Sequence, residues 1–323
     1  MMTKDAVLRM LWQNPDRFLS GEILAKELNI SRTAVWKAVK QLRAEGYDIE
    51  SVTHRGHRLL DKGDVLTEQS VCRFLHSQNI LPRVYSRIGS TNTALKTMAA
   101  EGAPEGTALI AGEQTDGRGR MGRSFYSPPD SGLYLSLLLR PQLPAAEAVK
   151  LTACAAVAVC ETIEELSGLE TQIKWVNDVL IAGKKVCGIL TEGSLDCESG
   201  QLSYAVVGVG VNTAVPKGDF PPALRQIAGA VFGEDRPPML RSRLAAGILD
   251  RLMAYCVKPD DPAVFEAYRR RSLVPGREIT VLSPGREPEA ATALALDTDF
   301  GLLVRLPDGS VKKLSSGEVS IRA

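Results

Sequence analysis

Apolar and polar positions alternate with a helical period over most of the first 45 residues. Apolar side chains recur every three or four residues within 5–13, 21–28 and 31–43, the spacing that gives a helix one buried face. Ser31 precedes the third segment, where a serine hydroxyl caps a first helical turn. The pattern therefore predicts three short helices. The residues expected to be buried in the first two are Val7, Leu8, Leu11, Trp12, Ile23, Leu24 and Leu28.

A hairpin pattern follows these helices. Residues 47–60 alternate around a turn at 54–57, and two short helices followed by a hairpin resemble a winged helix-turn-helix, which binds DNA. Residues 1–60 contain ten Lys or Arg against seven Asp or Glu, a local net charge of +3, and 31–43 has no acidic residue. We predict DNA binding, with a helical protein-interaction domain as the alternative. The predicted DNA-binding residues are Ser31, Arg32, Thr33, Lys37, Lys40 and Arg55.

The central part of the chain reads as strands with interspersed helices. A helix is expected from about Ser90 to Ala100, and an alanine-rich, buried helix within 144–166. These helices together with short apolar runs predict an α/β domain. The runs that predict strands are 84–88, 107–111, 133–139, 185–190 and 205–211.

The pattern changes again near the C-terminus. Residues 238–256 and 263–271 have helical spacing, and after Gly276 only short strand-like segments remain. Short strands separated by turns suit a small β-barrel. The strands are expected at 279–282, 291–296 and 302–306. The fold class expected for the whole chain is therefore α+β with several domains.

One loop concentrates candidate chemistry. Between the strands at 107–111 and 133–139, residues 112–123 read Gly-Glu-Gln-Thr-Asp-Gly-Arg-Gly-Arg-Met-Gly-Arg. Glycine allows close approach to a ligand, and guanidinium groups bind phosphate or carboxylate. The loop therefore suits an anionic ligand, with a solvated basic loop as the alternative. No Gly-Lys-Ser or Gly-Lys-Thr sequence occurs, so a nucleotide bound here is not held by a Walker loop.

Two further segments place polar residues beside apolar ones. Ser90-Thr91-Asn92 begins the helix after a strand, where these side chains either cap the helix or line a polar pocket. In 171–180, Lys174, Asn177 and Asp178 stand among apolar residues and need partners or a ligand. Strand alternation places Lys185 on the inward face with Cys187 and Ile189, and Lys184 in solvent. Lys185 is therefore the better functional candidate.

Composition changes this picture little. The 323 residues suffice for two or three domains, and the formal net charge of +1 leaves electrostatic binding to local patches. Six cysteines without Cys-x-x-Cys spacing predict reduced, buried thiols rather than a metal site or disulfides. No apolar run approaches the length of a membrane-spanning helix, and no signal-type core opens the chain. We expect a cytoplasmic protein without a membrane partner.

Taken together, the ordered motifs resemble those of biotin protein ligases, and with the winged helix they resemble the bifunctional ligases that also repress biotin operons. The resemblance covers essentially the whole chain. Phe125 and Val176 depart from the tryptophan and proline that are common in the family. The motifs that carry the resemblance are Ser90-Thr91-Asn92, Glu113-Gln114-Thr115 with the 117–123 loop, Ser131–Ser136, Lys174-Trp175-Val176-Asn177-Asp178, Lys185–Leu190 and Gly208–Asn212.

The resemblance implies a winged helix-turn-helix at 1–62, a central catalytic domain of the biotin/lipoate ligase type at 63–272, and an SH3-like barrel at 273–323. It implies two half-reactions: biotin and Mg-ATP form biotinyl-5′-AMP and pyrophosphate, and a lysine of an acceptor protein then takes the biotinyl group. No enzyme nucleophile is needed, and the three histidines, His54, His57 and His76, all precede the central domain.

The resemblance also implies residue roles. The catalytic residues would be Arg118, Arg120, Lys185 and Asp178. Biotin would contact Ser90, Thr91, Asn92, Gln114, Arg118, Gly119, Arg120 and Lys185. The nucleotide would contact Arg118, Arg120, Arg123, Phe125, Asn177 and Asn212. No protein-held metal site is expected beyond the Mg²⁺ that accompanies ATP.

The implied partners are a biotin carboxyl carrier protein, as in acetyl-CoA carboxylase, and operator DNA. A homodimer is expected when biotinyl-5′-AMP, as corepressor, is bound. The main alternative is a transcription regulator that senses biotin without catalysis. A nearer alternative is a lipoate ligase of similar fold, which the winged helix and the arginine loop disfavour.

Overall fold

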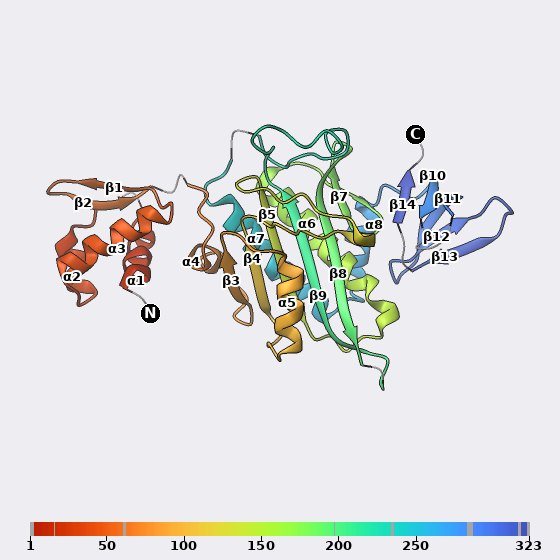
Figure 1. The fold of residues 1–323 in the computed structure, drawn as a ribbon, viewed down its shortest axis with the longest axis horizontal. Coiled ribbons are helices and arrows are strands. Elements are labelled where there is room, and N and C mark those ends of the chain that lie inside the picture. Colours follow the sequence, from red (N-terminus) through yellow and green to blue (C-terminus); the bar gives the residue numbers. More distant parts are fainter. Residues whose placement is uncertain are drawn as a thin grey trace. The chain divides into compact units, whose positions relative to one another are not determined.

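The computed structural model describes residues 3–15, 17–60, 63–196, 198–233, 236–282, 287–315 and 318–321. The chain divides into two compact units, one comprising Met1–Arg73 and Arg236–Arg243 and the other Phe74–Asp235 and Leu244–Ala323. Residues 61 and 62, at the end of the first predicted domain, and Cys197 lie outside the described residues. Figure 1 colours the chain from a red N-terminus to a blue C-terminus.

The first unit has the helix and hairpin order of a winged helix-turn-helix, as the pattern predicted. The Oγ of Ser31 caps the third helix by accepting a hydrogen bond from the Ala34 N–H at 3.1 Å. The hairpin is antiparallel and pairs Ile49 with Leu59 and Val52 with Gly56. The elements are α1 (Thr3–Gln13), α2 (Gly21–Glu27), α3 (Arg32–Ala44), β1 (Ile49–Val52), β2 (Gly56–Leu59) and α4 (Glu68–Cys72).

The core of this unit confirms most of the predicted buried faces. The prediction for Ile23 is wrong, because this side chain is 43% exposed while its neighbour Leu24 is fully buried. Helix α2 is too short to bury more than one apolar row against α3. The buried apolar residues of the three helices are Val7, Leu8, Leu11, Leu24, Val35, Ala38, Val39 and Leu42.

The second unit is built on a seven-stranded sheet with the order β3-β4-β5-β9-β8-β7-β6. Only β3 and β4 run parallel, and every other neighbouring pair is antiparallel. The expected α/β domain therefore has a mixed, mainly antiparallel sheet. The strands are β3 (Leu81–Tyr85), β4 (Thr107–Ala111), β5 (Gly132–Leu139), β6 (Gln172–Lys174), β7 (Asp178–Ile181), β8 (Lys184–Leu195) and β9 (Leu202–Asn212).

Two helices cover opposite faces of this sheet. Helix α5 (Thr91–Ala100) packs on β4, β5 and β9, and its Asn92 amide reaches Glu192 of β8. Helix α6 (Val149–Ser167) packs on β7, β8 and β9, and its Thr152 hydroxyl lies 2.8 Å from that of Thr191. Because Thr191 and Glu192 are successive strand residues, their side chains leave opposite faces. The remaining helices are α7 (Leu240–Val257) and α8 (Pro262–Arg271), with short 3₁₀ turns at Arg120–Gly122 and Ala145–Glu147.

The C-terminal strands form a five-stranded antiparallel sheet of order β13-β12-β11-β10-β14. The two outer strands do not pair with each other among the described residues, so the sheet is open and the expected closed barrel is not found. The indole N–H of Trp175 donates to the Phe300 carbonyl at 2.8 Å, which ties the turn before β12 to the central domain. The strands are β10 (Glu278–Leu282), β11 (Glu289–Leu296), β12 (Leu302–Arg305), β13 (Val311–Leu314) and β14 (Glu318–Ile321).

The described cysteines are all free thiols, and four of the five are buried. Cys72 is exposed, against the expectation of burial. Burial raises the pKa of the Cys160 thiol to about 12, which keeps it protonated and unreactive at neutral pH. Within the part of the chain that the structure describes, no helix is long and apolar enough to cross a bilayer.

Candidate functional site

The floor of the site is a row of residues that face one another across three strands. Ser136 of β5 pairs with Gly208 of β9, which pairs with Leu190 of β8. Asn92, from the first turn of α5, lies over this row. A Cβ at Gly208 would stand 2.1 Å from Oδ1 of Asn92, so only glycine admits this side chain.

The next row of the same three strands carries an aromatic ring. Tyr134 pairs with Gly210, which pairs with Gly188. The ring of Phe125, from the end of the arginine loop, lies on the two glycines. A Cβ would approach it to 2.5 Å at Gly210 and 3.0 Å at Gly188. The absence of two side chains therefore creates the space that the ring occupies.

A small polar cavity of about 50 Å³ lies above these rows. The Oγ of Ser90 caps α5, and Gln114 Oε1 accepts from the Thr91 N–H at 2.8 Å. Ser90, Thr91 and Asn92 are each at most 5% exposed. Capping and pocket lining are thus compatible, because Ser90 does both. All eight residues predicted to bind biotin line this cavity: Ser90, Thr91, Asn92, Gln114, Arg118, Gly119, Arg120 and Lys185.

A second and larger cavity of about 390 Å³ adjoins the first. Five of the six residues predicted to bind the nucleotide line it, while Arg118 lines the first cavity alone. The residues common to both cavities are Gly119, Arg120, Phe125, Asn177 and Lys185. The second cavity is lined in addition by Arg123, Lys174, Asp178, Asn212, Phe220, Leu224, Ile227 and their neighbours.

The boundary between the cavities carries fixed charges. Lys185 Nζ lies 2.6 Å from Asp178 Oδ1, and Arg120 Nη1 donates to Asn177 Oδ1 at 2.9 Å. Asn177 Nδ2 in turn donates to Asp178 Oδ1 at 3.2 Å and to the Ile189 carbonyl at 3.1 Å. Two cations are therefore held, by Asn177 in the turn after β6 and by Asp178 at the start of β7, at the point where ligands in the two cavities would meet.

The expected face for Lys185 is wrong, and a β-bulge explains the difference. Along β7 and β8, Val179 pairs with Cys187 but Leu180 pairs with Lys185, so Val186 has no partner. The bulge turns Lys185 away from the Cys187 face. A Cβ at Gly188 would lie 3.3 Å from Lys185 Nζ, which puts the ammonium above the glycine.

Lys184 does not point freely into solvent as expected. Its ammonium donates to the carbonyl oxygens of Arg225 and Gln226, at 3.3 and 2.6 Å. The same segment pairs with β8, because the Lys185 N–H donates to the Ile227 carbonyl at 2.8 Å. Lys184 thus holds a wall of the second cavity and does not line either cavity.

The arginine loop is itself folded as a tight hairpin. The Phe125 N–H donates to the Gly117 carbonyl at 2.8 Å, and the Gly119 N–H donates to the Arg123 carbonyl at 2.7 Å. Arg118 is 47% exposed and lies 3.5 Å from Asp116. The hairpin therefore places Arg118 and Arg120 among the residues that line the first cavity.

Several residues of the site were not predicted from the sequence. Ser136 belongs to the Ser131–Ser136 motif, but no function was predicted for it. Its hydroxyl lies 2.6 Å from Asn92 Oδ1, to which it donates. Glu192 accepts from Asn92 and pairs with Lys96. Alternation in β8 could have placed Glu192 on the face of Leu190. The wall formed by 220–228 had no signal, because its residues are not part of a periodic segment.

The described residues contain no group of three or more His, Cys, Asp or Glu side chains that could hold a metal ion. A divalent cation in the second cavity would therefore take its ligands mainly from nucleotide phosphate oxygens and water.

A separate basic surface lies on the first unit. All six predicted DNA-binding residues are exposed. One of them, Ser31, also caps α3. Trp36, overlooked in the sequence, is 58% exposed on the outer face of α3, with Lys40 Nζ 5.4 Å from its ring centre. In the wing region, Phe18 lies under Arg55 and Arg58, at 4.3 and 4.7 Å.

Three family models match the chain. They are the biotin/lipoate A/B protein ligase family over residues 84–212, an HTH domain over 3–58, and the biotin protein ligase C-terminal domain over 275–322. The first covers every residue that lines the small cavity and all of the large cavity except its wall at 220–228, and the second covers the basic surface.

Similar proteins are found along almost the full length. The bifunctional ligase/repressor BirA of Bacillus subtilis (strain 168) is 33% identical, with 98% of this chain and 97% of that protein aligned. A biotin–[acetyl-CoA-carboxylase] ligase of Mycobacterium tuberculosis is also 33% identical, over 73% of this chain and 87% of that one. Among solved structures, the biotin protein ligase from Aquifex aeolicus in complex with biotin and ATP matches with a TM-score of 0.60 and 28% identity, covering 75% of this chain and 98% of that one.

Proposed function

The chain belongs to the biotin protein ligases of the biotin/lipoate A/B protein ligase family, and we propose that it is a bifunctional member. It uses ATP to activate biotin and transfers it to a lysine of a biotin carboxyl carrier protein, and it represses transcription through its helix-turn-helix domain. A regulator that only senses biotin is not favoured, because the relatives aligned over nearly the whole chain are named ligases.

The first half-reaction joins two anions. A carboxylate oxygen of biotin attacks the α-phosphorus of ATP, and the bond from that phosphorus to the bridging oxygen breaks to release pyrophosphate. Biotin in the small cavity and ATP in the large one would react at the boundary, beside Arg120 and Lys185. Fixed cations there offset the repulsion between the reactants and stabilise the charge that develops on the phosphate. Mg²⁺ enters with the phosphates of ATP.

The second half-reaction needs an amine rather than an enzyme nucleophile. The neutral ε-amine of the acceptor lysine attacks the biotinyl carbonyl carbon, AMP leaves, and the amine loses its proton. Asp178 is the acidic group at the boundary and is placed to accept that proton or to orient the amine. Its ion pair with Lys185 would then open as the phosphate takes the lysine.

The observation that carries the proposal is the pair of adjoining cavities that share Arg120 and Lys185. The test is release of pyrophosphate from Mg-ATP. Release that requires biotin and is unaffected by lipoate supports a biotin ligase. Release without biotin, or with lipoate in its place, would reject this assignment.

The remaining features of the proposal concern organisation. We infer a division at 1–62, 63–272 and 273–323, supported by family matches that fall within these ranges. The C-terminal sheet would act as an SH3-like module that contacts the nucleotide site or the acceptor protein. Adenylate-bound protein would dimerise, so that two recognition helices meet half-sites roughly 34–36 Å apart on DNA.

A further inference from the structure

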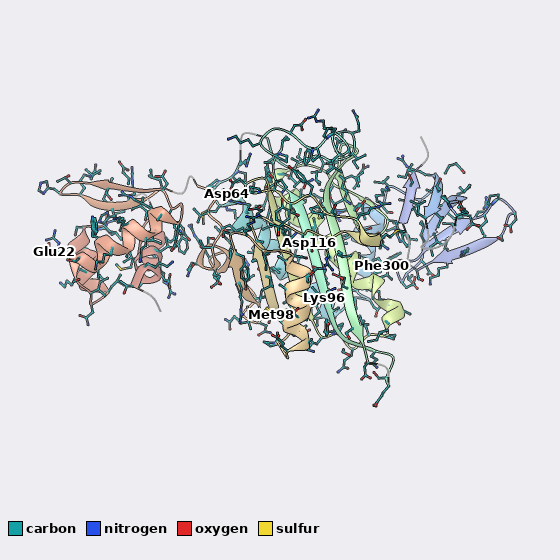
Figure 2. All side chains as sticks on the ribbon, in the orientation of Figure 1. Glu22, Asp64, Lys96, Met98, Asp116 and Phe300 are labelled. Carbon is teal, nitrogen blue, oxygen red and sulfur yellow. The ribbon has the colours of Figure 1, made fainter. Side chains whose placement is uncertain are left out.

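A turn of the C-terminal sheet holds the segment that leads to Asn177 and Asp178. Phe300, labelled in Figure 2, lies between β11 and β12, and its carbonyl oxygen accepts from the indole N–H of Trp175 at 2.8 Å. Both residues are 1% exposed, so water does not compete for this bond. Trp175 stands two positions before Asn177. The hydrogen bond therefore joins the C-terminal sheet to the turn that carries part of the cavity boundary.

A second hydrogen bond holds the same turn one residue further along. The hydroxyl of Tyr268, in α8, donates to the Val176 carbonyl at 3.2 Å. Burial raises the pKa of this phenol well above its ordinary value, so the hydroxyl keeps its proton. Because a peptide unit is planar, a bond to the Val176 carbonyl also fixes the plane that carries the Asn177 N–H. The Tyr268 ring in turn packs edge-on to Phe300, with ring centres 5.3 Å apart.

The turn that carries Phe300 is held in a conformation that costs energy. Phe300 has a φ of +64°, in the left-handed region that a bulky side chain rarely adopts. Its N–H donates to the Asp297 carbonyl at 2.8 Å, and Lys313 pairs with the carboxylates of Asp297 and Asp299 at 2.7 and 2.5 Å. Strain of this kind persists only where the surroundings enforce it, and it is concentrated at functional positions. Phe300 is therefore a fixed anchor rather than an adaptable loop residue.

The two anchored residues line neither cavity, whereas the two that follow them do. Trp175 and Val176 are absent from both cavity walls, but Asn177 lines both cavities and Asp178 lines the larger one. The side chains of Asn177 and Asp178 hold the two cations of the boundary. A displacement of the turn at 175–176 would therefore move both cations together.

We propose that Tyr268 and Trp175, anchored on Phe300, are positioning residues for the formation of the adenylate. They set the turn from which Asn177 and Asp178 hold the cations that meet the phosphate. The inference rests on the proposed function, because it concerns the step that releases pyrophosphate. If these contacts served stability alone, their loss would not act through Asn177, and this difference can be measured.

The test is a double-mutant cycle in the full chain, with biotin-dependent pyrophosphate release as the readout. Tyr268→Phe removes only the hydroxyl and should lower kcat about fivefold, the effect of losing one neutral hydrogen bond. KM for biotin should stay within about twofold, because the anchored residues line neither cavity. In an Asn177→Ala background the same substitution should lower kcat by about twofold at most, because one of the residues through which it acts is already gone.

Tyr255→Phe is the matched control. It also removes one phenol hydroxyl, in this case one on α7 that donates to Glu161. This variant should keep kcat within about twofold of the wild type, since its lost bond does not touch the turn at 175–176. An equal loss in Tyr255→Phe and Tyr268→Phe, or a rise in KM with an unchanged kcat in Tyr268→Phe, would contradict the inference.

Trp175→Phe removes the other anchoring bond and should give the same pattern, so it replaces Tyr268→Phe if that variant does not fold. Loss of folding in both variants would mean that the contacts serve stability alone. The same factor lost with and without Asn177 would reject this inference and leave the proposed function standing. A wild-type chain that releases no pyrophosphate in the presence of biotin would reject both.

Discussion

Lys185 Nζ lies 2.6 Å from the carboxylate of Asp178, although Asp178 is paired in the sheet with Gly188 and not with Lys185. The bulge at Val186 makes this contact possible, because it turns the lysine onto the Gly188 side. The aspartate holds the ammonium at the boundary of the two cavities. A phosphate that arrives there can replace the aspartate as its partner.

The two adjacent lysines should differ sharply in their effect on adenylate formation. Lys185→Gln should slow pyrophosphate release by about 10²–10³-fold, the usual effect of removing one donor to a developing oxyanion. Lys184→Gln should slow it by less than about fivefold, since it loses only two bonds to backbone carbonyl oxygens in the wall of the second cavity. Both are followed by a coupled pyrophosphate assay. Similar, mild losses would remove Lys185 from its catalytic role.

A methyl group at Gly210 should disturb both cavities through Phe125. A Cβ there would stand 2.5 Å from the ring, and overpacking of this kind costs about 1–3 kcal/mol. We expect Gly210→Ala to raise KM for biotin and for ATP together, because the ring lines both cavities. Gly21→Ala is the control, since nothing lies within 4 Å of the added atom. Unchanged Michaelis constants in Gly210→Ala would show that the ring does not order the site.

The partly buried ion pair Arg271–Glu164 should make stability depend on pH in the acidic range. Burial alone would raise the pKa of Glu164, but hydrogen bonds from Arg271, with nitrogen to oxygen distances of 2.9 and 2.5 Å, and from Thr171 hold that pKa below 4.5. A lowered folded-state pKa stabilises the protein above the ordinary value and loses this contribution as the pH falls through the lower one.

Glu164→Gln should therefore destabilise the protein at neutral pH by roughly 1–3 kcal/mol, less than for a fully buried pair because Glu164 is partly in water. The difference from the wild type should shrink as the pH falls below the ordinary pKa of a glutamate side chain, because the carboxylate is then lost in both states. Thermal melts over a pH series measure it. A difference that is constant with pH would mean that the ion pair contributes nothing measurable.

Substitution of the cations of α3 and substitution of its exposed tryptophan should change the salt dependence of DNA binding differently. Arg32→Ala and Lys37→Ala should each lower the slope of log K against log salt by about 0.9, since each removes one phosphate contact. Trp36→Ala should weaken binding without changing that slope, because it removes an uncharged ring that is 58% exposed. Duplexes selected by the biotin- and ATP-loaded protein serve as probe in a salt series. If no variant changes affinity, the outer face of α3 is not the DNA-binding surface.

Sequence patterns predicted a helix or strand well where that element depends only on residues close by in the sequence. Ser31 and Ser90 cap the helices expected of them, because a cap needs only the following turn. The seven-stranded order could not be read this way, since β5 pairs with β9, which lies far along the chain. The mainly antiparallel sheet and the open C-terminal sheet were missed for the same reason.

The residues of the site were easier to predict than their contacts. The resemblance to a family supplied Arg120, Asn177 and Lys185, and the structure brings all three to the shared boundary. It could not supply the bulge at Val186, because a bulge depends on the partner strand. Nor could it supply Glu192, which accepts a hydrogen bond from Asn92, a residue 100 positions earlier in the chain.

The most direct test of the central claim is mass spectrometry of a biotin carboxyl carrier domain incubated with this protein, biotin and Mg-ATP. We expect the mass gain of one biotinyl group on a single lysine. The gain should require ATP and fall strongly in Lys185→Gln. A folded, biotin-binding protein that leaves the carrier unmodified would contradict the assignment as a ligase.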